Sequence, residues 1–123
     1  MTKKTILVVD DSSSLRTAVR IALTGAGYDV AEADDGQTAL TRLDGRKYHL
    51  VISDVNMPRM DGLTFVTQMK EKPAYKYTPV LMLTTEAGEG KKAQGKAAGA
   101  KAWMVKPFQP QQLVDVVAKL VLA

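Results

Sequence analysis

The sequence has 123 residues, which is the usual size of one globular domain. Apolar residues make up 46% and charged residues 24%, as in an ordinary folded chain, so a disordered protein is excluded. The chain has no cysteine, which excludes disulfides, thiol catalysis and cysteine-based zinc sites. Its one histidine, His49, leaves little material for a multi-histidine metal site or a histidine-centred triad.

The net charge of +4 is unevenly distributed along the chain. Residues 1–62 hold 8 basic and 9 acidic side chains, and residues 63–123 hold 9 basic and 4 acidic ones. Because no aromatic residues alternate with the basic ones, a solvated basic face is favoured over nucleic-acid binding. No apolar run approaches the ~18 residues of a membrane span, and the N-terminus has no signal-peptide pattern, so we expect a cytoplasmic protein.

Strands and helices are expected to alternate five times. The run from Thr5 to Asp10 is apolar and β-branched, as in a strand buried on both faces. The other predicted strands are Tyr28–Ala33, Tyr48–Ser53, Pro79–Thr84 and Ala102–Val105. Helices are expected from apolar residues at helical spacing, over Leu15–Leu23, Ala39–Leu43, Leu63–Met69, Glu86–Ala98 and Pro110–Leu122. The helix over Glu86–Ala98 is the weakest, because interior glycines destabilise helices.

This alternation predicts a doubly wound α/β fold in a single domain, residues 1–123, with a parallel sheet covered on both faces. Ligands of such sheets bind beyond the carboxyl ends of the strands, where the winding reverses. If it reverses between the first and third strands, Asp10, Asp11 and Asp54 meet at one point. Thr84 and Lys106 follow the fourth and fifth strands at the same edge.

Three carboxylates gathered at a rim repel one another, so such a cluster usually holds a cation or raises a pKa. Oxygen ligands without histidine or cysteine suit Mg²⁺, with Mn²⁺ as a second choice. Lys106 would add a point charge and Thr84 a hydroxyl for an anion beside the metal. Since aspartate is a known nucleophile towards phosphorus, these groups favour a site for a phosphoryl group carried on a carboxylate.

Taken alone, each of these residues also has a simpler interpretation. Asp10 or Asp11 could cap the first helix, and Asp54 could be a turn residue. Lys106 could be a solvated rim lysine, which would contribute little to stability. Trp103 could be an ordinary core residue.

Four motifs in order, at these spacings, carry a resemblance that covers the whole chain. They are Asp10-Asp11, Ser53–Gly62, Thr84–Ala87 and Trp103–Phe108. The sequence resembles the response-regulator receiver domains, and among these the stand-alone chemotaxis regulators of the CheY type. The resemblance implies a flavodoxin-like fold, a five-stranded parallel sheet of order 2-1-3-4-5 with five helices.

The resemblance also implies a role for each site residue. Asp54 would be the phosphoacceptor, Thr84 and Lys106 would bind phosphoryl oxygens, and the Lys106–Pro107 peptide bond would be cis. The implied Mg²⁺ ligands are Asp10, Asp11, Asp54 and the backbone carbonyl of Asn56. The implied rate-tuning residues are Asn56, Thr85 and Glu86, where the bulk of Thr85 departs from the small residue usual in relatives. The residues themselves predict the switch and partner surface: the weak helix carries a basic excess at Lys91, Lys92 and Lys96, and Trp103 lies between it and Lys106. Trp103 stands where relatives usually have a tyrosine or phenylalanine.

In function, the resemblance implies a phosphoacceptor signalling protein, which catalyses only its own phosphorylation and dephosphorylation and is not otherwise an enzyme. Its partners would be a histidine kinase, a target such as the flagellar-motor switch protein, and a phosphatase. A phosphorelay intermediate or a receiver for a non-flagellar target stays open as the alternative. We expect a monomer with no nucleic-acid or membrane partner, and no output domain, because the sequence ends one helix after the fifth strand.

Two other functions fit the residues less well. A flavodoxin would bind the flavin phosphate after the first strand, where Asp10 and Asp11 would repel it. A phosphatase of the haloacid dehalogenase type would need Asp-x-Asp after the first strand and a cap domain. Here the candidate nucleophile, Asp54, follows the third strand, and 123 residues leave no room for a cap.

Overall fold

The computed structural model describes residues 3–55, 57, 60–84 and 99–122. In this part of the chain five strands form one parallel sheet of order β2-β1-β3-β4-β5, which confirms the predicted fold class. The strands are β1 (Thr5–Val9), β2 (Asp29–Ala33), β3 (Leu50–Asp54), β4 (Val80–Thr84) and β5 (Ala102–Val105).

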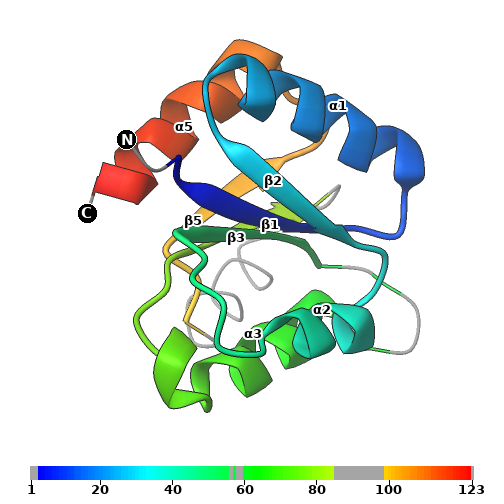
Figure 1. The fold of residues 1–123 in the computed structure, drawn as a ribbon. Helices are drawn as coiled ribbons and strands as arrows, with labels where there is room; N and C mark the ends of the chain where they lie inside the picture. Colours follow the sequence, from blue (N-terminus) through cyan, green and yellow to red (C-terminus); the bar gives the residue numbers. More distant parts are fainter. Residues whose placement is uncertain (1–2, 56, 58–59, 85–98, 123) are drawn as a thin grey trace.

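Helices cover both faces of this sheet (Figure 1). One face is covered by α1 (Ser13–Gly25) and α5 (Pro110–Leu122). The other is covered by α2 (Gly36–Arg42) and α3 (Gly62–Lys70), and the 3-10 turn η1 (Pro73–Tyr75) follows α3. The helix expected over Glu86–Ala98 lies outside the described residues. Of the helices that are described, none is both long and apolar enough to cross a membrane.

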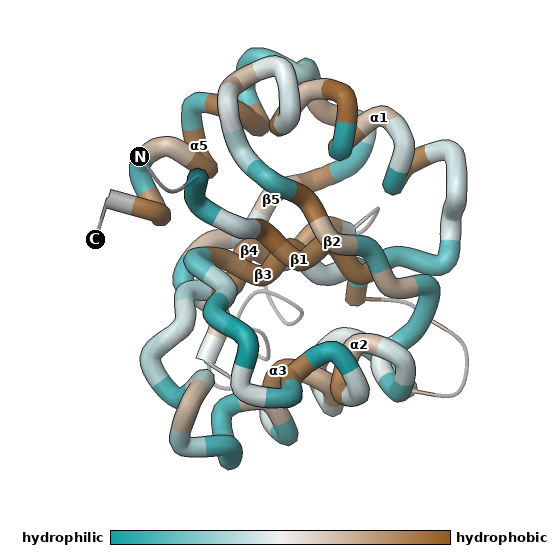
Figure 2. The backbone as a smooth tube through the Cα atoms, in the orientation of Figure 1, coloured by the Kyte–Doolittle hydropathy of each residue, from teal (hydrophilic) through white to brown (hydrophobic). Residues whose placement is uncertain are grey.

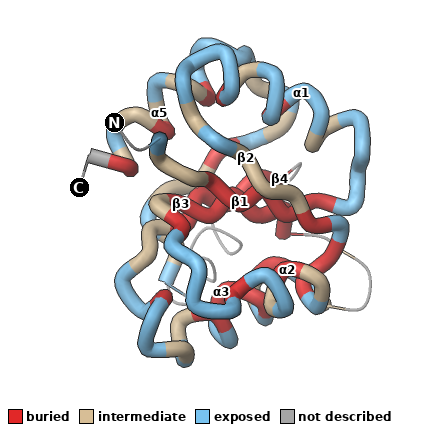
Figure 3. Tube along the Cα trace, in the orientation of Figure 1, coloured by how far each residue is buried: buried red, intermediate tan, exposed pale blue. Residues whose placement is uncertain are grey.

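The central strands supply the core on both faces. Every residue of β3 and β4 is buried, and so is every residue of β1 after the first. Because successive side chains of a strand point to opposite faces, Leu7 and Val51 pack towards α2 and α3, whereas Ile6 and Ile52 pack towards α1 and α5. The hydrophobic and buried residues therefore concentrate in the sheet (Figures 2 and 3). Burial on both faces explains the continuous apolar runs in the sequence.

The register of the sheet aligns the carboxyl ends of the strands. Val9 of β1 lies beside Ser53 of β3, and Thr84 of β4 lies beside Val105 of β5. The residues that follow these strands therefore begin at one edge. This alignment is the condition on which the predicted carboxylate cluster depends.

The turn between β3 and α3 requires glycine where it closes. Gly62 begins α3, and its N–H donates to the carbonyl of Val55 at 2.8 Å. Asp61 caps the helix by accepting from the N–H of Thr64 at 2.7 Å. A β-carbon on Gly62 would overlap the carbonyl oxygen of Asp54 and lie 3.0 Å from the Cα of Val55. Both contacts are with backbone atoms, so neither can be relieved by a change of side-chain rotamer.

We expect Gly62→Ala to lower the free energy of unfolding by about 1–3 kcal/mol, the usual range when overpacking must be relieved by a backbone shift. The matched control is Gly25→Ala, because Gly25 ends α1 and a β-carbon there would meet no heavy atom of the described chain within 4 Å. Urea unfolding of the two variants measures the difference. Equal midpoints would mean that the turn after β3 has room to adjust.

Candidate functional site

Three carboxylates meet at the carboxyl edge of the sheet, as the sequence predicted. Asp10 and Asp11 follow β1, and Asp54 is the last residue of β3. One carboxylate oxygen from each residue lies within 4.8 Å of the other two. Asp10 and Asp54 are buried, whereas Asp11 is exposed, so the cluster opens to solvent on the side of Asp11.

Lys106 bridges the two buried carboxylates. Its Nζ donates to Oδ2 of Asp10 at 2.9 Å and lies 3.3 Å from Oδ1 of Asp54. Burial lowers the pKa of this ammonium group, but the hydrogen bond and charge of Asp10, together with Asp54, outweigh burial and leave the pKa raised. Lys106 therefore carries its full charge at neutral pH. Its side chain is only 16% exposed, so the interpretation as a solvated rim lysine is wrong.

Asp10 is fixed by its backbone as well as by its carboxylate. Its N–H donates to the carbonyl of Ala33 on β2 at 3.1 Å, and its own carbonyl accepts from Nη1 of Arg16 at 2.5 Å. Its Oδ1 accepts from the N–H of Ser12 at 2.9 Å. The N-cap of α1 is Ser12, whose hydroxyl accepts from the N–H of Leu15 at 3.2 Å. The simpler interpretation, in which Asp10 or Asp11 caps α1, is therefore wrong.

Thr84 lies between the strands that carry the two charges. It ends β4, which has β3 with Asp54 on one side and β5, leading to Lys106, on the other. Thr84 and Asp54 are both buried, and the N–H of Lys106 donates to the carbonyl of Thr84 at 2.7 Å. The Lys106–Pro107 peptide bond is cis, as the resemblance implied.

The donor set of the cluster fits a hard divalent cation. Its three described members are all carboxylates, and oxygen ligands of this kind suit Mg²⁺ or Mn²⁺. Mg²⁺ keeps several of its waters, and the exposed Asp11 leaves an open side for them. The one lysine that the described residues place against the cluster cannot neutralise three carboxylates, so a bound cation would relieve repulsion between them.

Trp103 lies in β5 and packs against the core cluster beneath α2 and α3. Its indole Nε1 is buried and finds no hydrogen-bond partner in the described chain. Since a buried indole N–H usually has a partner, this group would gain from a rearrangement around it. Trp103 is thus a half-buried residue at the margin of the core whose indole N–H has no partner among the described residues, and it lies close along the chain to Lys106.

Several predicted site residues cannot be placed in this geometry. They lie outside the described residues: Asn56, Thr85, Glu86, Lys91, Lys92 and Lys96. Two charged residues that the sequence did not single out do contribute to the site, Arg16 and Glu32. The signal that points to Arg16 is a basic residue near a helix N-terminus, where acidic ones are favoured.

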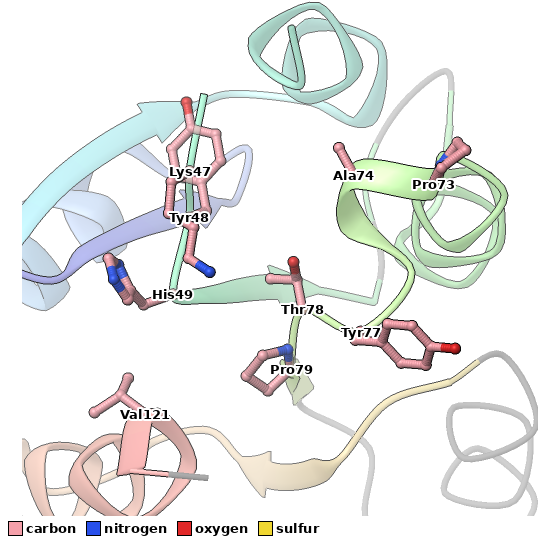
Figure 4. A pocket seen from close by; sticks show the side chains of 9 residues that line it. All are labelled: Lys47, Tyr48, His49, Pro73, Ala74, Tyr77, Thr78, Pro79 and Val121. Carbon is pink, nitrogen blue, oxygen red and sulfur yellow. The ribbon is translucent and has the colours of Figure 1, made fainter. Parts of the chain in front are cut away.

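A hollow of about 330 Å³ lies at the opposite edge of the sheet (Figure 4). The segments that lead into β3 and β4 line it, with Lys47, His49 and Thr78 among the labelled side chains, and Val121 of α5 faces them. None of the predicted site residues belongs to its lining. The carboxylate cluster is therefore a separate site, at the other end of the strands.

Comparison with known proteins agrees with this geometry. Residues 6–118 match the model of the response regulator receiver domain family. The chain is 40% identical over 112 residues to chemotaxis protein CheY1 of Helicobacter pylori, covering 89% of this chain and 90% of that one. It is 36% identical over 116 residues to chemotaxis protein CheY of Pseudomonas aeruginosa, covering 94% of each.

A solved structure gives the same result in three dimensions. The chemotaxis response regulator CheY4 of Vibrio cholerae has a TM-score of 0.92 and 45% identity, over 97% of this chain and 99% of that chain. The matches in sequence and in fold thus agree with one another. The chain belongs to the response-regulator receiver domain family.

Proposed function

We propose that this receiver domain accepts a phosphoryl group on Asp54 from a histidine kinase and thereby changes its affinity for a target protein. One observation carries the proposal: Lys106 contacts Asp10 and Asp54 together, beside the exposed Asp11. This arrangement puts the Asp54 carboxylate next to a fixed positive charge and next to two further carboxylates that can hold Mg²⁺.

The proposed reaction is a displacement at phosphorus. A carboxylate oxygen of Asp54 forms the new bond to phosphorus while the bond to the imidazole nitrogen of the kinase histidine breaks, and that nitrogen keeps the electron pair. The ammonium group of Lys106 would then bind a phosphoryl oxygen in place of the Asp54 carboxylate, and the hydroxyl of Thr84 would donate to another phosphoryl oxygen.

A cation at this site would be held by Asp10, Asp11, Asp54 and the backbone carbonyl of Asn56. Bound Mg²⁺ supplies neutralisation of the negative charge on the phosphoryl oxygens. Hydrolysis of the acyl phosphate then returns the carboxylate, and Asn56, Thr85 and Glu86 would set its rate. The protein would catalyse only these two reactions of its own side chain.

Chemotaxis is the proposed setting, because relatives that cover most of the chain are named chemotaxis proteins. In that setting the chain acts as a cytoplasmic monomer with a kinase of the CheA type, the flagellar-motor switch protein of the FliM type as target, and a phosphatase. The alternative is a phosphorelay intermediate or a receiver for a non-flagellar target. What separates the two is whether phosphorylation makes the domain bind purified motor switch protein.

The proposed partner surface comprises Trp103 with Lys91, Lys92 and Lys96. Its basic excess would favour a partner that presents acidic groups. A conformational change caused by phosphorylation of Asp54 would be transmitted to this surface through Thr84 and the backbone of β5, which contains Trp103. A bias of a few kcal/mol is enough to shift such a two-state element.

Incubation with acetyl phosphate and Mg²⁺ should add one acid-labile, hydroxylamine-sensitive phosphate to the protein, detected by intact mass spectrometry. Asp54→Asn should abolish it, because the amide is not a nucleophile, and chelation of the metal should prevent it. Asp34→Asn is the control, since Asp34 is exposed at the same edge, whereas Asp35 caps α2. Full labelling of Asp54→Asn would place the phosphoacceptor elsewhere.

Replacing Lys106 should destabilise the metal-free protein. Lys106→Met removes the ammonium group that lies against two buried carboxylates. We expect a loss of about 1–3 kcal/mol, below the range for fully buried pairs because the lysine is partly exposed. Lys119→Met, on the exposed side of α5, should change stability by less than about 0.5 kcal/mol.

The same unfolding measurements with added Mg²⁺ test the reason for this loss. The cation should stabilise Lys106→Met more than the wild type, because the ammonium group no longer competes with it for the carboxylates. Equal stability of wild type and Lys106→Met without metal would contradict the role of Lys106 as counter-charge.

Phosphorylation should change the emission or the quencher accessibility of Trp103, the one tryptophan of the sequence. The physical reason is its buried, unpartnered indole N–H, which a rearrangement of β5 could satisfy. Steady-state fluorescence with acetyl phosphate measures the change, and Asp54→Asn should show none. A constant signal from a fully phosphorylated wild type would place the switch outside Trp103.

A further inference from the structure

Arg16 joins three parts of the chain around the carboxylate cluster. It lies near the start of α1, and its Nη1 donates to the carbonyl of Asp10 at 2.5 Å. Its Nε donates to Oε1 of Glu32 on β2 at 3.2 Å. The side chain is only 17% exposed. One planar guanidinium therefore connects α1, the turn after β1, and β2.

The helix itself gains nothing from an arginine at this place. Its unpaired N–H groups give the first turn a partial positive charge, which favours acidic side chains there. Yet α1 has no acidic residue in its first turn, and Arg16 comes only three residues after Ser13, where the helix begins. The balancing charge comes from Glu32 on the neighbouring strand instead. A basic residue where the helix favours acidic ones indicates that Arg16 has a role outside α1.

The group that Arg16 binds, the backbone carbonyl of Asp10, indicates what this role is. The carbonyl of Asp10 belongs to the peptide group that joins it to Asp11, and a charged donor fixes the plane of that group. The carboxylate of Asp11 is exposed, and within the described chain no hydrogen bond or ion pair holds it. Its position therefore depends on the backbone that Arg16 holds.

We propose that Arg16, braced by Glu32, is a positioning residue that keeps Asp11 in place to bind the cation. This inference rests on the proposed function, because it assumes that the cluster takes Mg²⁺. Arg16 touches neither the metal nor the phosphoryl group, and it acts through the peptide plane between Asp10 and Asp11. Partners that orient metal ligands in this indirect way typically change metal affinity by ~10–100-fold when they are removed.

Mg²⁺ titration of the full chain, followed by two-dimensional NMR, is the first test. Arg16→Met keeps the stem but removes the guanidinium, and should weaken Mg²⁺ binding by about tenfold. Arg20→Met is the matched control. Arg20 lies one turn along the same helix and approaches the other oxygen of Glu32 at 3.7 Å, but is 47% exposed, so its loss should change affinity by less than about twofold.

Arg16→Lys provides a second variant in case Arg16→Met does not fold. It keeps the charge but lacks the planar fork that spans Asp10 and Glu32 together, so it should still bind Mg²⁺ more weakly than Arg20→Met. Asp11→Ala serves as the reference for complete loss of the site. If the wild type shows no binding that depends on Asp11, the proposed function fails.

Amide hydrogen exchange of the metal-free protein tests the positioning role by itself. The N–H of Ser12 donates to Oδ1 of Asp10, so its exchange reports on the turn that Arg16 holds. Exchange at Ser12 should become about tenfold faster in Arg16→Met and stay unchanged in Arg20→Met. Equal exchange in these two variants, or wild-type Mg²⁺ affinity in a folded Arg16→Met, would overturn the proposal.

Discussion

Three carboxylates repel one another at one edge of the parallel sheet, and the strands, turns and charges around them hold them together. Asp10, directly after β1, and Asp54, at the end of β3, are buried, and one carboxylate oxygen from each lies within 4.8 Å of one from Asp11. Such a cluster would spread apart unless the backbone were held firmly and part of the charge were balanced. The surrounding structure meets both requirements.

The backbone is held by the core. β1 and β3 pack on both faces, so neither strand can shift without disturbing two layers of side chains. Gly62 lets α3 start directly against the end of β3, which closes the turn beside Asp54. The charge is balanced by Lys106, which is 96 residues from Asp10 in sequence and meets it only in the folded chain. The site is thus as stable as the sheet that carries it.

The aspartates at this edge fall into two groups: some cap helices, and the others form the carboxylate cluster. Asp35 and Asp61 cap α2 and α3 by accepting backbone N–H groups, so their charges are met by helix termini. The cap of α1 is the uncharged Ser12, which leaves Asp10 and Asp11 available for a cation. Arg16 at the start of the same helix fits this division, since it acts on the turn before the helix and on β2.

The alternation of buried strands and amphipathic helices was determined by the sequence itself, because periodicity and turn residues act over short distances. The expectation that Asp10, Asp11 and Asp54 meet followed from parallel strands, whose carboxyl ends share an edge. The sequence did not predict how deeply each charged side chain is buried or which charges it pairs with. The sequence placed Lys106 at the site but left its burial and its ion pairs open, and it did not single out Arg16 or Glu32. The burial of Lys106, the ion pairs of Lys106 and Arg16, and the raised pKa of Lys106 arise from contacts between residues far apart in the chain, so they appear only when the chain is folded.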